Sequence, residues 1–343
     1  MPYLVGTDEA GYGPNLGPLV ISVSVWWVPE ELVGGDLYDL LREVVCDKPE
    51  RGEAARIAIA DSKQLYKPRG DVALLERGLL PALALLERSS ANGNFKNGNF
   101  ENGDSEQKPC LTEQLDWQRL WHLLAGDSAA PRQDLPWYDD FQLPLPWSLE
   151  PTVLRAAIKM LDQGCATAGV RLVTLRSLAV FPQQFNRLCA ELDSKGAALS
   201  RLTMELLSEA LESLHEPAYV VCDKHGGRNR YATLLQEHFP EFLIQIRHEG
   251  RAESAYRWGP ESERVEIHFR SGGERFLPAA LASMACKYLR ELAMLALNRY
   301  WSTRVENLQP TAGYPVDAKR FKQEIATAQE ALGIADEQLW RAR

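Results

Sequence analysis

Apolar residues occur along the chain in two patterns, short runs typical of strands and longer stretches with helical spacing. The short runs predict five strands, at residues 3–7, 19–28, 172–180, 218–222 and 242–246. The first two runs are close enough to pair as a hairpin, and the later ones alternate with helices. This order predicts an α/β protein with a mixed β-sheet flanked by helices.

Three of the helices are predicted from an apolar stripe or from their place after a turn. One stripe spans Leu199 to Leu214 and leads directly into the predicted strand at 218–222. A second spans 278–300, with Pro278 in a plausible first turn. A third helix is predicted at 317–332, within a C-terminal helical extension at 301–343.

Residues 89–150 differ in composition from the rest of the chain. The stretch 89–108 is rich in Asn, Gly and Ser and contains Asn-Gly-Asn-Phe twice, so it has too little apolar surface to offset its ordering entropy. Beyond it, the chain is rich in Trp and Pro, with helical spacing only near 113–124. We interpret 89–150 as an insertion in one domain spanning 1–343, with 89–108 flexible. The alternative is a boundary between two domains, which would leave a small N-terminal core.

Composition and charge exclude several classes of protein. With 45% hydrophobic and 25% charged residues among 343, the chain is neither collagenous nor wholly disordered. The longest apolar stretch, 18–29, is too short to span a bilayer, and it lacks the charged n-region of a signal peptide, so we expect a soluble cytoplasmic protein without a membrane partner. The net charge of −9 opposes non-specific binding to nucleic acid. Any nucleic-acid contact must therefore be local or carried by metal ions.

The cysteines give no sign of a disulfide framework or a zinc site. They are scattered, with no Cys-x-x-Cys pair and no His at zinc-ligand spacing, which is typical of reduced structural thiols. They are the residues at positions 46, 110, 165, 189, 222 and 286.

The first candidate site is the glycine-rich turn after the first strand. Asp8 and Glu9 stand where that strand enters a turn containing Gly11, Gly13 and Gly17. Ligands commonly collect at strand ends in α/β sheets. The alternative is that the acids are solvated and the glycines only supply positive φ. The turn lacks the glycine spacing and the Lys-Ser/Thr pair of familiar nucleotide-binding loops.

A second acid has the same position relative to a strand. Asp223 ends the predicted strand at 218–222, and Lys224, Arg228 and Arg230 follow it. The alternative for this cluster is a salt-bridged surface loop. Cys222 is interpreted as a small buried hydrophobe rather than a nucleophile.

The third candidate lies at the start of the predicted helix 278–300. Glu274 precedes the helix, while Ser283, Lys287 and Arg290 recur on one of its faces. A face with one hydroxyl and two cations can receive an anion. The alternative is an ordinary surface face with long cationic side chains.

Together these pieces resemble the type 2 ribonucleases H, and in part their type 3 relatives. The order of the motifs along the chain agrees with that family, and the resemblance covers nearly the whole chain outside 89–150. The resembling motifs are Asp8-Glu-Ala-Gly-Tyr-Gly-Pro with Gly17-Pro-Leu-Val, Ala60-Asp-Ser-Lys-Gln-Leu, Val220-Val-Cys-Asp, Glu274 with Pro278, Ala282-Ser283 and Cys286-Lys287, and Gly313-Tyr-Pro-Val-Asp.

Two positions depart from the family pattern. Tyr12 stands where the type 2 family has Arg, and its type 3 relatives typically Lys, between the two glycines. This departure concerns substrate selectivity. Glu274 stands where type 2 proteins usually have Asp, which mainly alters the reach of the carboxylate.

The resemblance implies a ribonuclease H-like fold and a metal-dependent endonuclease. It implies hydrolysis of the RNA strand of RNA:DNA hybrids, or of ribonucleotides embedded in DNA, by two Mg²⁺ or Mn²⁺ ions, leaving 3′-hydroxyl and 5′-phosphate ends. Such a role belongs to DNA replication and repair. The implied catalytic and metal-binding residues are Asp8, Glu9, Asp223 and Glu274. Independently of the resemblance, carboxylates drawn together repel and stay ionised most easily around hard cations.

The substrate contacts implied by the resemblance lie around the same acids. The backbone of the Gly11–Gly13 turn would contact the 2′-hydroxyl, while cationic and hydroxyl side chains contact phosphate. The implied nucleic-acid-binding residues are Gly11, Tyr12, Gly13, Lys63, Ser283 and Lys287. The Asp61-Ser-Lys segment can equally be a helix cap or an Asx turn.

Two alternatives to an active nuclease remain. The first is a catalytically weak or inactive homologue that binds nucleic acid, and the second is a structural partner protein that acts through the Trp-rich part of 89–150. Retention of all four acids favours the nuclease, because a binding protein gains nothing from negative charge where phosphate approaches. We expect the protein to be a monomer.

Overall fold

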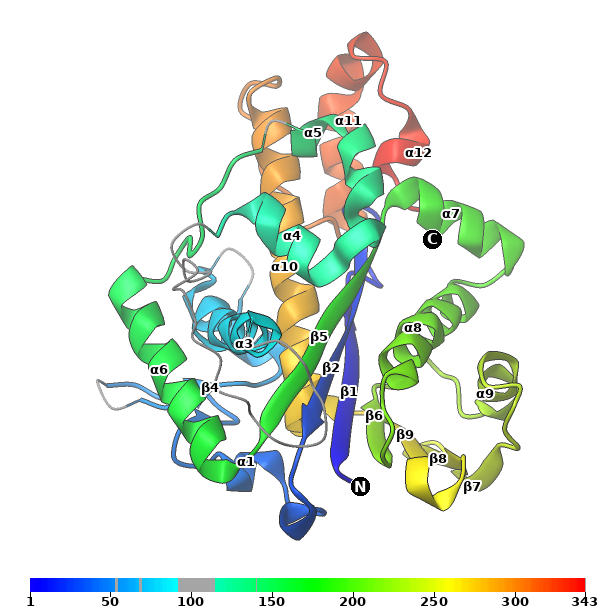
Figure 1. The fold of residues 1–343 in the computed structure, drawn as a ribbon. Helices are drawn as coiled ribbons and strands as arrows, with labels where there is room; N and C mark the ends of the chain where they lie inside the picture. The colour runs from blue at the N-terminus through cyan, green and yellow to red at the C-terminus, as the bar shows by residue number, and fades with distance from the viewer. Residues whose placement is uncertain (53–54, 68–69, 92–114, 140, 343) are drawn as a thin grey trace.

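The computed structural model describes residues 1–52, 55–67, 70–91, 115–139 and 141–342 (Figure 1). The predicted flexible stretch 89–108 begins inside helix α3 (Ala73–Ala91), and its remainder from residue 92 lies outside the described residues. Cys110 lies outside them as well. The other five cysteines are free thiols.

A seven-stranded mixed sheet forms the centre of the protein, in the order β5-β2-β1-β6-β9-β8-β7. β1 pairs antiparallel with β2 and parallel with β6, and β6 pairs parallel with β9. The predicted mixed sheet flanked by helices is therefore confirmed. The strands are β1 (Tyr3–Ala10), β2 (Leu19–Trp27), β5 (Arg171–Val180), β6 (Ala218–Cys222), β7 (Gln245–Glu249), β8 (Glu253–Trp258) and β9 (Val265–Arg270).

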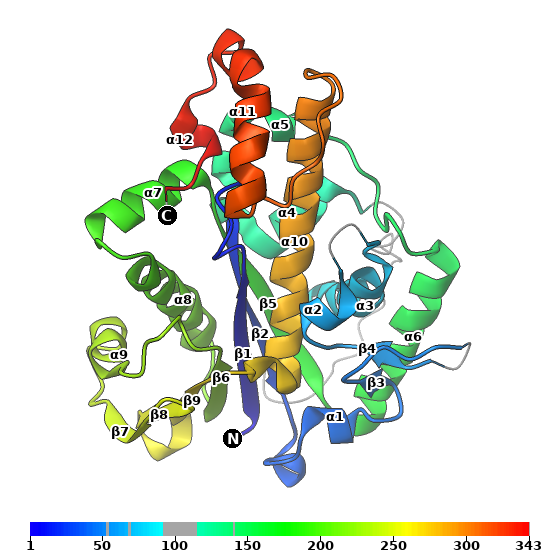
Figure 2. The ribbon, with the colours of Figure 1, turned by 180° about the vertical axis from the view of Figure 1, so that it is seen from behind.

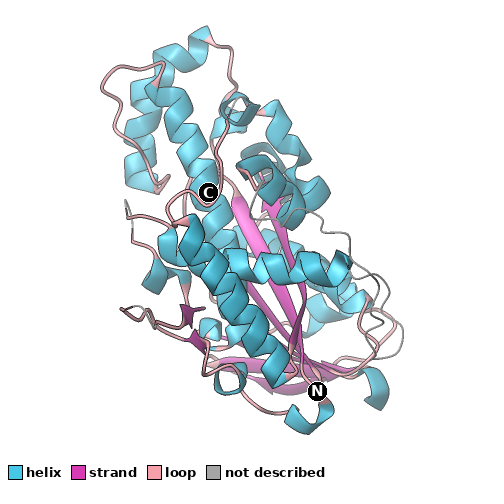
Figure 3. Ribbon diagram, turned by 60° about the vertical axis from the view of Figure 1, so that its left-hand side comes forward, coloured by secondary structure: helices cyan, strands magenta, loops and turns pink. Residues whose placement is uncertain are grey.

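Helices cover both faces of this sheet because alternate strand residues are apolar on each side. In β1, Leu4 packs into one core and Val5 into the other, and in β2, Val20 and Ile21 divide in the same way. The helices on the two sides are seen in Figures 1 to 3. The first core contains α3, α6 (Pro151–Ala168) and α10 (Leu277–Ser302), and the second contains α8 (Lys195–Glu212) and α9 (Ala232–His238).

The N-terminal end of α10 rests directly on β1 at Gly6. A Cβ atom at Gly6 would lie 2.0 Å from the backbone nitrogen of Ala279, which leaves no room for any side chain. On β2, Ser24 donates a hydrogen bond of 2.7 Å to the carbonyl oxygen of Pro278. This close approach fixes the start of α10 next to the last residues of β1.

The aromatic residues after position 114 are part of the main core. α4 (Trp117–Ala125) places Trp121 in a stacked contact with Phe181, with ring centroids 6.0 Å apart. Trp137 in α5 (Pro136–Asp139) meets Tyr300 of α10 at 6.2 Å. The helical spacing near 113–124 thus corresponds to α4. The interpretation of 89–150 as an insertion stays a prediction.

The remaining elements are short or connect the layers. They are η1 (Glu30–Leu32), α1 (Leu37–Leu40), β3 (Val45–Cys46), β4 (Ile57–Ala58), α2 (Ser62–Leu65), η3 (Gly126–Asp134), α7 (Pro182–Glu191), η4 (Glu261–Glu263), η5 (Gly273–Arg275), α11 (Pro315–Ala331) and α12 (Asp336–Leu339). The predicted helices at 199–214, 278–300 and 317–332 correspond to α8, α10 and α11 and are confirmed.

The predicted strand at 242–246 is wrong in its position. Gln236 of α9 accepts a hydrogen bond from the backbone nitrogen of Ile244 and donates one to the carbonyl oxygen of Phe242, which holds this segment as a loop. The strand β7 begins at Gln245 and forms an exposed edge of the sheet. Four strands were not predicted, namely β8 and β9 of the central sheet and the short pair β3 and β4. Across the described residues, no helix is long and apolar enough to cross a membrane.

Candidate functional site

The parallel strands β1, β6 and β9 bring three predicted acids to the same edge of the sheet. Thr7 is in register with Cys222, so the next residues, Asp8 and Asp223, lie at neighbouring carboxyl ends. Cys222 is also in register with Phe269 of β9, and Glu274 follows that strand within η5. Ligand sites form at such edges because the chain leaves the sheet there.

Burial and the charges of the neighbouring acids shift the pKa values of three of these carboxylates. Burial raises the pKa of Asp8 from its ordinary value of 3.8 to about 7, against a hydrogen bond from Ser283, and the charge of Asp223 adds to the rise. Burial followed by the charges of Asp8 and Asp223 raises the pKa of Glu9 well above its ordinary value. The pKa of Asp223 is raised by burial and, to a smaller extent, by Glu274. Asp8, Glu9 and Asp223 thus repel one another, and Glu274 repels Asp223.

Lys63 is the cation that faces these acids. Burial lowers its pKa, but the charges of Asp61, Asp8, Glu274 and Asp223 outweigh burial and raise it overall. Asp61 is the N-cap of α2, and its Oδ1 accepts a hydrogen bond of 3.0 Å from the backbone nitrogen of Lys63. The cap interpretation of this segment is confirmed, and the cap itself orients Lys63 beside the carboxylates.

Ser283 connects α10 to α2 beside Asp8. It is buried, its Oγ lies 3.0 Å from Ser62 Oγ, and the Oγ accepts a hydrogen bond of 3.3 Å from the backbone nitrogen of Ser62. Lys287, one turn later, already has partners: its Nζ lies 2.5 Å from Glu291 Oε1 and 4.7 Å from the centre of the Tyr66 ring.

Arg290 does not extend an anion-binding face, which corrects the interpretation of that helix face. Its side chain is only 3% exposed, because α10 is enclosed on this side by the loops before β2 and α11. Its Nη2 donates to the carbonyl oxygens of Leu16 at 3.2 Å and Ala312 at 3.1 Å. Arg290 is a structural brace between those loops.

The glycine-rich turn beside the acids has a backbone that other side chains would not adopt. Gly11 has φ of +95° and Gly17 has φ of +79°, and a Cβ at Gly11 would lie 2.5 Å from the carbonyl oxygen of Pro18. Gly13 is exposed, and a Cβ there would meet the Tyr314 ring at 3.6 Å. Tyr314 itself is 56% exposed, so the turn presents open backbone next to an aromatic side chain.

Distant parts of the chain hold this turn in place. The backbone nitrogens of Asn15 and Leu16 donate to the carbonyl oxygen of Gly313 at 2.7 and 3.3 Å. Arg341 Nη2 donates to the carbonyl oxygens of Gly11 and Pro14, and the Arg341 backbone nitrogen donates to Asn15. None of these contacts is predictable from local sequence.

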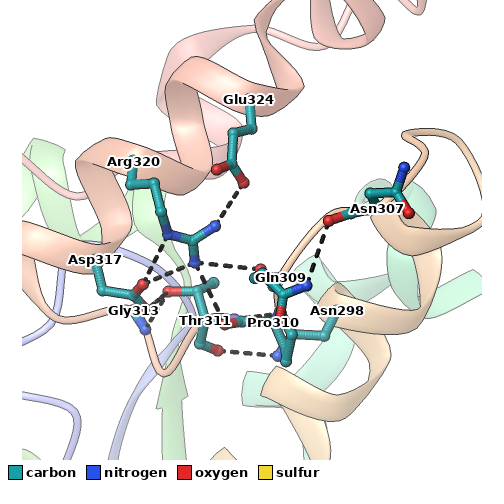
Figure 4. A network of polar contacts seen from close by, with 9 residues as sticks. All are labelled: Asn298, Asn307, Gln309, Pro310, Thr311, Gly313, Asp317, Arg320 and Glu324. Atoms are coloured by element: carbon teal, nitrogen blue, oxygen red, sulfur yellow. Dashed lines mark hydrogen bonds and ion pairs between the residues drawn. The ribbon is translucent and has the colours of Figure 1, made fainter.

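The loop that carries Gly313 is fixed by a polar network between α10 and α11 (Figure 4). Thr311 exchanges two hydrogen bonds of 2.9 Å with the side chain of Asn298, and its Oγ1 donates to Asp317 Oδ2 at 2.6 Å. Arg320 binds Asp317 Oδ1 at 2.7 Å and Glu324 at 2.5 Å. The Gly313 nitrogen then donates to Thr311 Oγ1 at 2.9 Å. The predicted turn before the last long helix is confirmed.

Lys224 and Arg230, which follow Asp223, contact their own loop and the β7–β8 hairpin. Lys224 Nζ donates to Asn229 Oδ1 at 2.9 Å and to the carbonyl oxygen of Gly250 at 2.6 Å. Arg230 lies 3.8 Å from Glu249. Cys222 is fully buried, as predicted, and burial raises its pKa to about 12.

The acids have the donor chemistry that suits a hard divalent cation, because carboxylate oxygens are the ligands that Mg²⁺ and Mn²⁺ prefer. As the side chains lie, however, no three His, Cys, Asp or Glu side chains within the described residues form a ready-made metal cage. For a cation to bind here, carboxylate oxygens of Asp8, Glu9, Asp223 and Glu274 would have to come together around it.

Two cationic residues beside the glycine turn were not predicted. Lys195 lies over the Tyr12 ring, and Arg341 donates a hydrogen bond to the carbonyl oxygen of Gly11 in the turn. Lys195 lies four residues before the predicted helix stripe, which begins at Leu199, and neither Lys195 nor Arg341 carried a local signal for this site.

No protein-family model matches the chain, and no curated protein matches it. Three similar solved structures cover 98 to 99% of this chain. The ribonuclease H2 of Pyrococcus horikoshii OT3 is 17% identical, with a TM-score of 0.41 and 92% of its chain covered. The RNase HII of Archaeoglobus fulgidus, in complex with PCNA, is 14% identical, with a TM-score of 0.41 and 94% covered. Bst-RNase HIII, in complex with Mn²⁺, is 13% identical, with a TM-score of 0.40 and 66% covered.

Proposed function

We propose that the protein is a metal-dependent endoribonuclease of the ribonuclease H type. It hydrolyses the RNA strand of RNA:DNA hybrids, or ribonucleotides embedded in DNA, and leaves 3′-hydroxyl and 5′-phosphate ends. The observation that carries this proposal is the gathering of Asp8, Glu9, Asp223 and Glu274 at one sheet edge, where burial and neighbouring carboxylates raise the pKa values of the first three. Burying carboxylates next to one another is energetically unfavourable, and carboxylates with such raised pKa values are typical of functional sites.

The four acids would hold Mg²⁺ or Mn²⁺. When bound, such ions polarise the phosphodiester and lower the pKa of water. The residues of this chain then have separate tasks. Ser283 orients Asp8 by a hydrogen bond, Lys63 offers a cation to the phosphate, and the open backbone at Gly13 approaches the ribose.

The experiment that tests this function is cleavage of a hybrid with a fluorescent 5′-labelled RNA strand, measured with Mg²⁺, with Mn²⁺ and with EDTA. Cleavage with either metal, none with EDTA and none of an all-DNA duplex are the expected results. Asp8→Asn and Asp223→Asn should each lose at least about a thousandfold in rate, because charge stabilisation in the transition state is lost. Asp162→Asn is the matched control, since Asp162 pairs with Arg88 on the surface of α6.

Two outcomes would contradict the proposal. Full activity in Asp8→Asn or Asp223→Asn would remove the four acids from catalysis. Tight hybrid binding without cleavage under any metal condition would instead favour the inactive binding protein.

A further inference from the structure

A cluster of positive charge without carboxylate partners lies beside the glycine turn. Lys195 is the first residue of α8, and its Nζ lies 4.5 Å from the centre of the Tyr12 ring. Within the described residues it forms no ion pair. The groups that act on its charge are Arg341, a second cation, and Cys189. By contrast, Lys287 of α10 forms an ion pair with Glu291.

Arg341 adds a buried and incompletely paired guanidinium to this cluster. The residue is 1% exposed and stacks over Phe185, with 5.0 Å between Cζ and the ring centre. Its Nη2 is used by the turn carbonyls, but its Nε and Nη1 have no hydrogen-bond partner among the described residues. A buried charge without a counter-ion is costly, so its positive potential extends toward any anion that reaches the turn.

The start of α8 completes the geometry. A Cβ at Gly196 would lie 3.6 Å from Tyr12 Oη, so the phenol hydroxyl lies against the first turn of this 18-residue helix. Helix N-termini carry partial positive charge and attract anions. A hydroxyl, an ammonium group and a helix N-terminus therefore meet at one place on the surface.

This place is directly connected to the carboxylates. The charge of Glu9 acts on the Tyr12 hydroxyl, and only Ala10 and Gly11 separate the two residues in the chain. A strand whose scissile phosphate lies at the acids would therefore pass close to Lys195. The protein carries a net charge of −9, which repels a polyanion. A cation without an ion pair beside the glycine turn would offset this repulsion locally and help to bind the substrate strand.

The geometry points to a phosphate-binding subsite formed by Lys195, the Tyr12 hydroxyl and the first turn of α8, which holds one phosphodiester of the nucleic-acid substrate. Arg341 is a positioning residue beneath it. This inference rests on the proposed function, since it assigns the subsite to the same substrate.

The test is binding of a fluorescent RNA:DNA hybrid in EDTA, measured by anisotropy across a salt series. Lys195→Gln should weaken binding about tenfold at low salt, the effect of one charge-assisted contact, and should reduce the slope of log K against log[salt] by about 0.9, the value for one phosphate. Lys195→Arg should restore most of the affinity. Lys159→Gln, on the exposed surface of α6, is the matched control and should change neither quantity.

A second measurement locates the contact on the substrate. Single methylphosphonate linkages, which are neutral, are scanned along the hybrid. At one position the neutral linkage should weaken binding by wild type but should add nothing to Lys195→Gln. In metal-activated cleavage, Lys195→Gln should raise KM about tenfold and leave kcat unchanged.

The outcomes separate this inference from the proposed function. If wild type cleaves the hybrid and Lys195→Gln matches it in affinity, salt slope and KM, the subsite is wrong and the function stands. If wild type neither binds nor cleaves the hybrid, both are wrong. A general loss at every methylphosphonate position in both proteins would also overturn the subsite.

Discussion

The guanidinium of Arg341 donates a hydrogen bond to the carbonyl oxygen of Gly11, a residue 330 positions earlier in the chain. The same Nη2 also binds the carbonyl oxygen of Pro14, and Asn15 donates its side-chain amide to the Arg341 carbonyl oxygen at 2.9 Å. The shape of the glycine turn therefore depends on the last described residues, which lie beside α7 (Figure 1).

Replacement of Arg341 by Met leaves two carbonyl oxygens without their donor, which costs about 2 kcal/mol, but it also removes a buried unpaired charge, so the free energy of unfolding should fall by less than this cost. It should also reduce hybrid cleavage about tenfold through loss of turn geometry. Urea unfolding and the cleavage assay measure the two effects. Arg187→Met, on the exposed face of α7, should change neither. Wild-type cleavage together with wild-type stability in Arg341→Met would show that the guanidinium does not hold the turn.

The order of the acids along the chain could be predicted, but their supporting contacts could not. Asp8 lies near the end of β1 and Asp223 directly follows β6, and the ends of a parallel strand pair meet at one sheet edge. β9 carried a clear signal in its strict alternation, Val-Glu-Ile-His-Phe-Arg, which the interpretation missed. Lys195 and Arg341 reach the site through tertiary packing over long sequence distances, and no local periodicity encodes such contacts.

For Arg290, in contrast, the sequence predicted a place on an anion-binding face that the structure does not have. Its helical spacing from Ser283 and Lys287 suggested one polar face, yet loops cover the last turn of that face. Periodicity predicts which residues share a helix face but not what packs on it, and α10 is buried on nearly all sides.

The metal-free protein should lose stability as the pH rises from about 4 to about 7. The pKa of Asp8 is raised by burial from 3.8 to about 7, so the folded state retains a proton that the unfolded state has released in this window. The pKa values of Glu9 and Asp223 are raised as well, so these acids add to the effect. The charge of Lys63 and the hydrogen bond of Ser283 oppose the rise in the pKa of Asp8. Thermal unfolding in EDTA measures the effect.

Asp8→Asn should flatten this pH dependence and match or exceed wild-type stability in EDTA. Mg²⁺ or Mn²⁺ should raise the Tm of wild type at pH 7.5, because an ion bound only by the folded state stabilises it. The shift should be smaller in Asp8→Asn. An equal shift in wild type and in the Asp8→Asn/Asp223→Asn double variant would contradict a metal site at these acids.

Glu76 of α3 anchors the segment before α6 from inside the core. It is fully buried, and Oε1 accepts hydrogen bonds of 2.6 Å from the Trp147 nitrogen and the Tyr288 hydroxyl. Oε2 accepts two of 2.8 Å, from the nitrogens of Ser148 and Leu149. An amide cannot replace it, because one of its two ends donates and would face N–H groups.

Glu76→Gln should therefore lower the free energy of unfolding by about 3 kcal/mol, and Tyr288→Phe by about 1 kcal/mol, since the latter removes a single hydrogen bond. Urea unfolding measures both. Glu209→Gln, exposed on α8, should stay within about 0.5 kcal/mol of wild type. A cost in Glu76→Gln no larger than in this control would mean that the segment before α6 does not depend on the carboxylate.

Tyr12→Arg should change stability and binding in opposite directions. In the free protein, a guanidinium at position 12 would stand against Lys195, which already lies over the Tyr12 ring beside Arg341, so like-charge repulsion should lower Tm at low salt. With nucleic acid bound, the added cation should meet phosphate, lower KM and increase the magnitude of the salt slope by about 0.9. The Tm difference from wild type should shrink at 0.5 M NaCl, where such repulsion is screened. The added contact between Arg at position 12 and the phosphate should also increase incision at a single ribonucleotide in DNA. A variant with the wild-type Tm, KM and salt slope would show that position 12 contacts neither Lys195 nor the substrate strand.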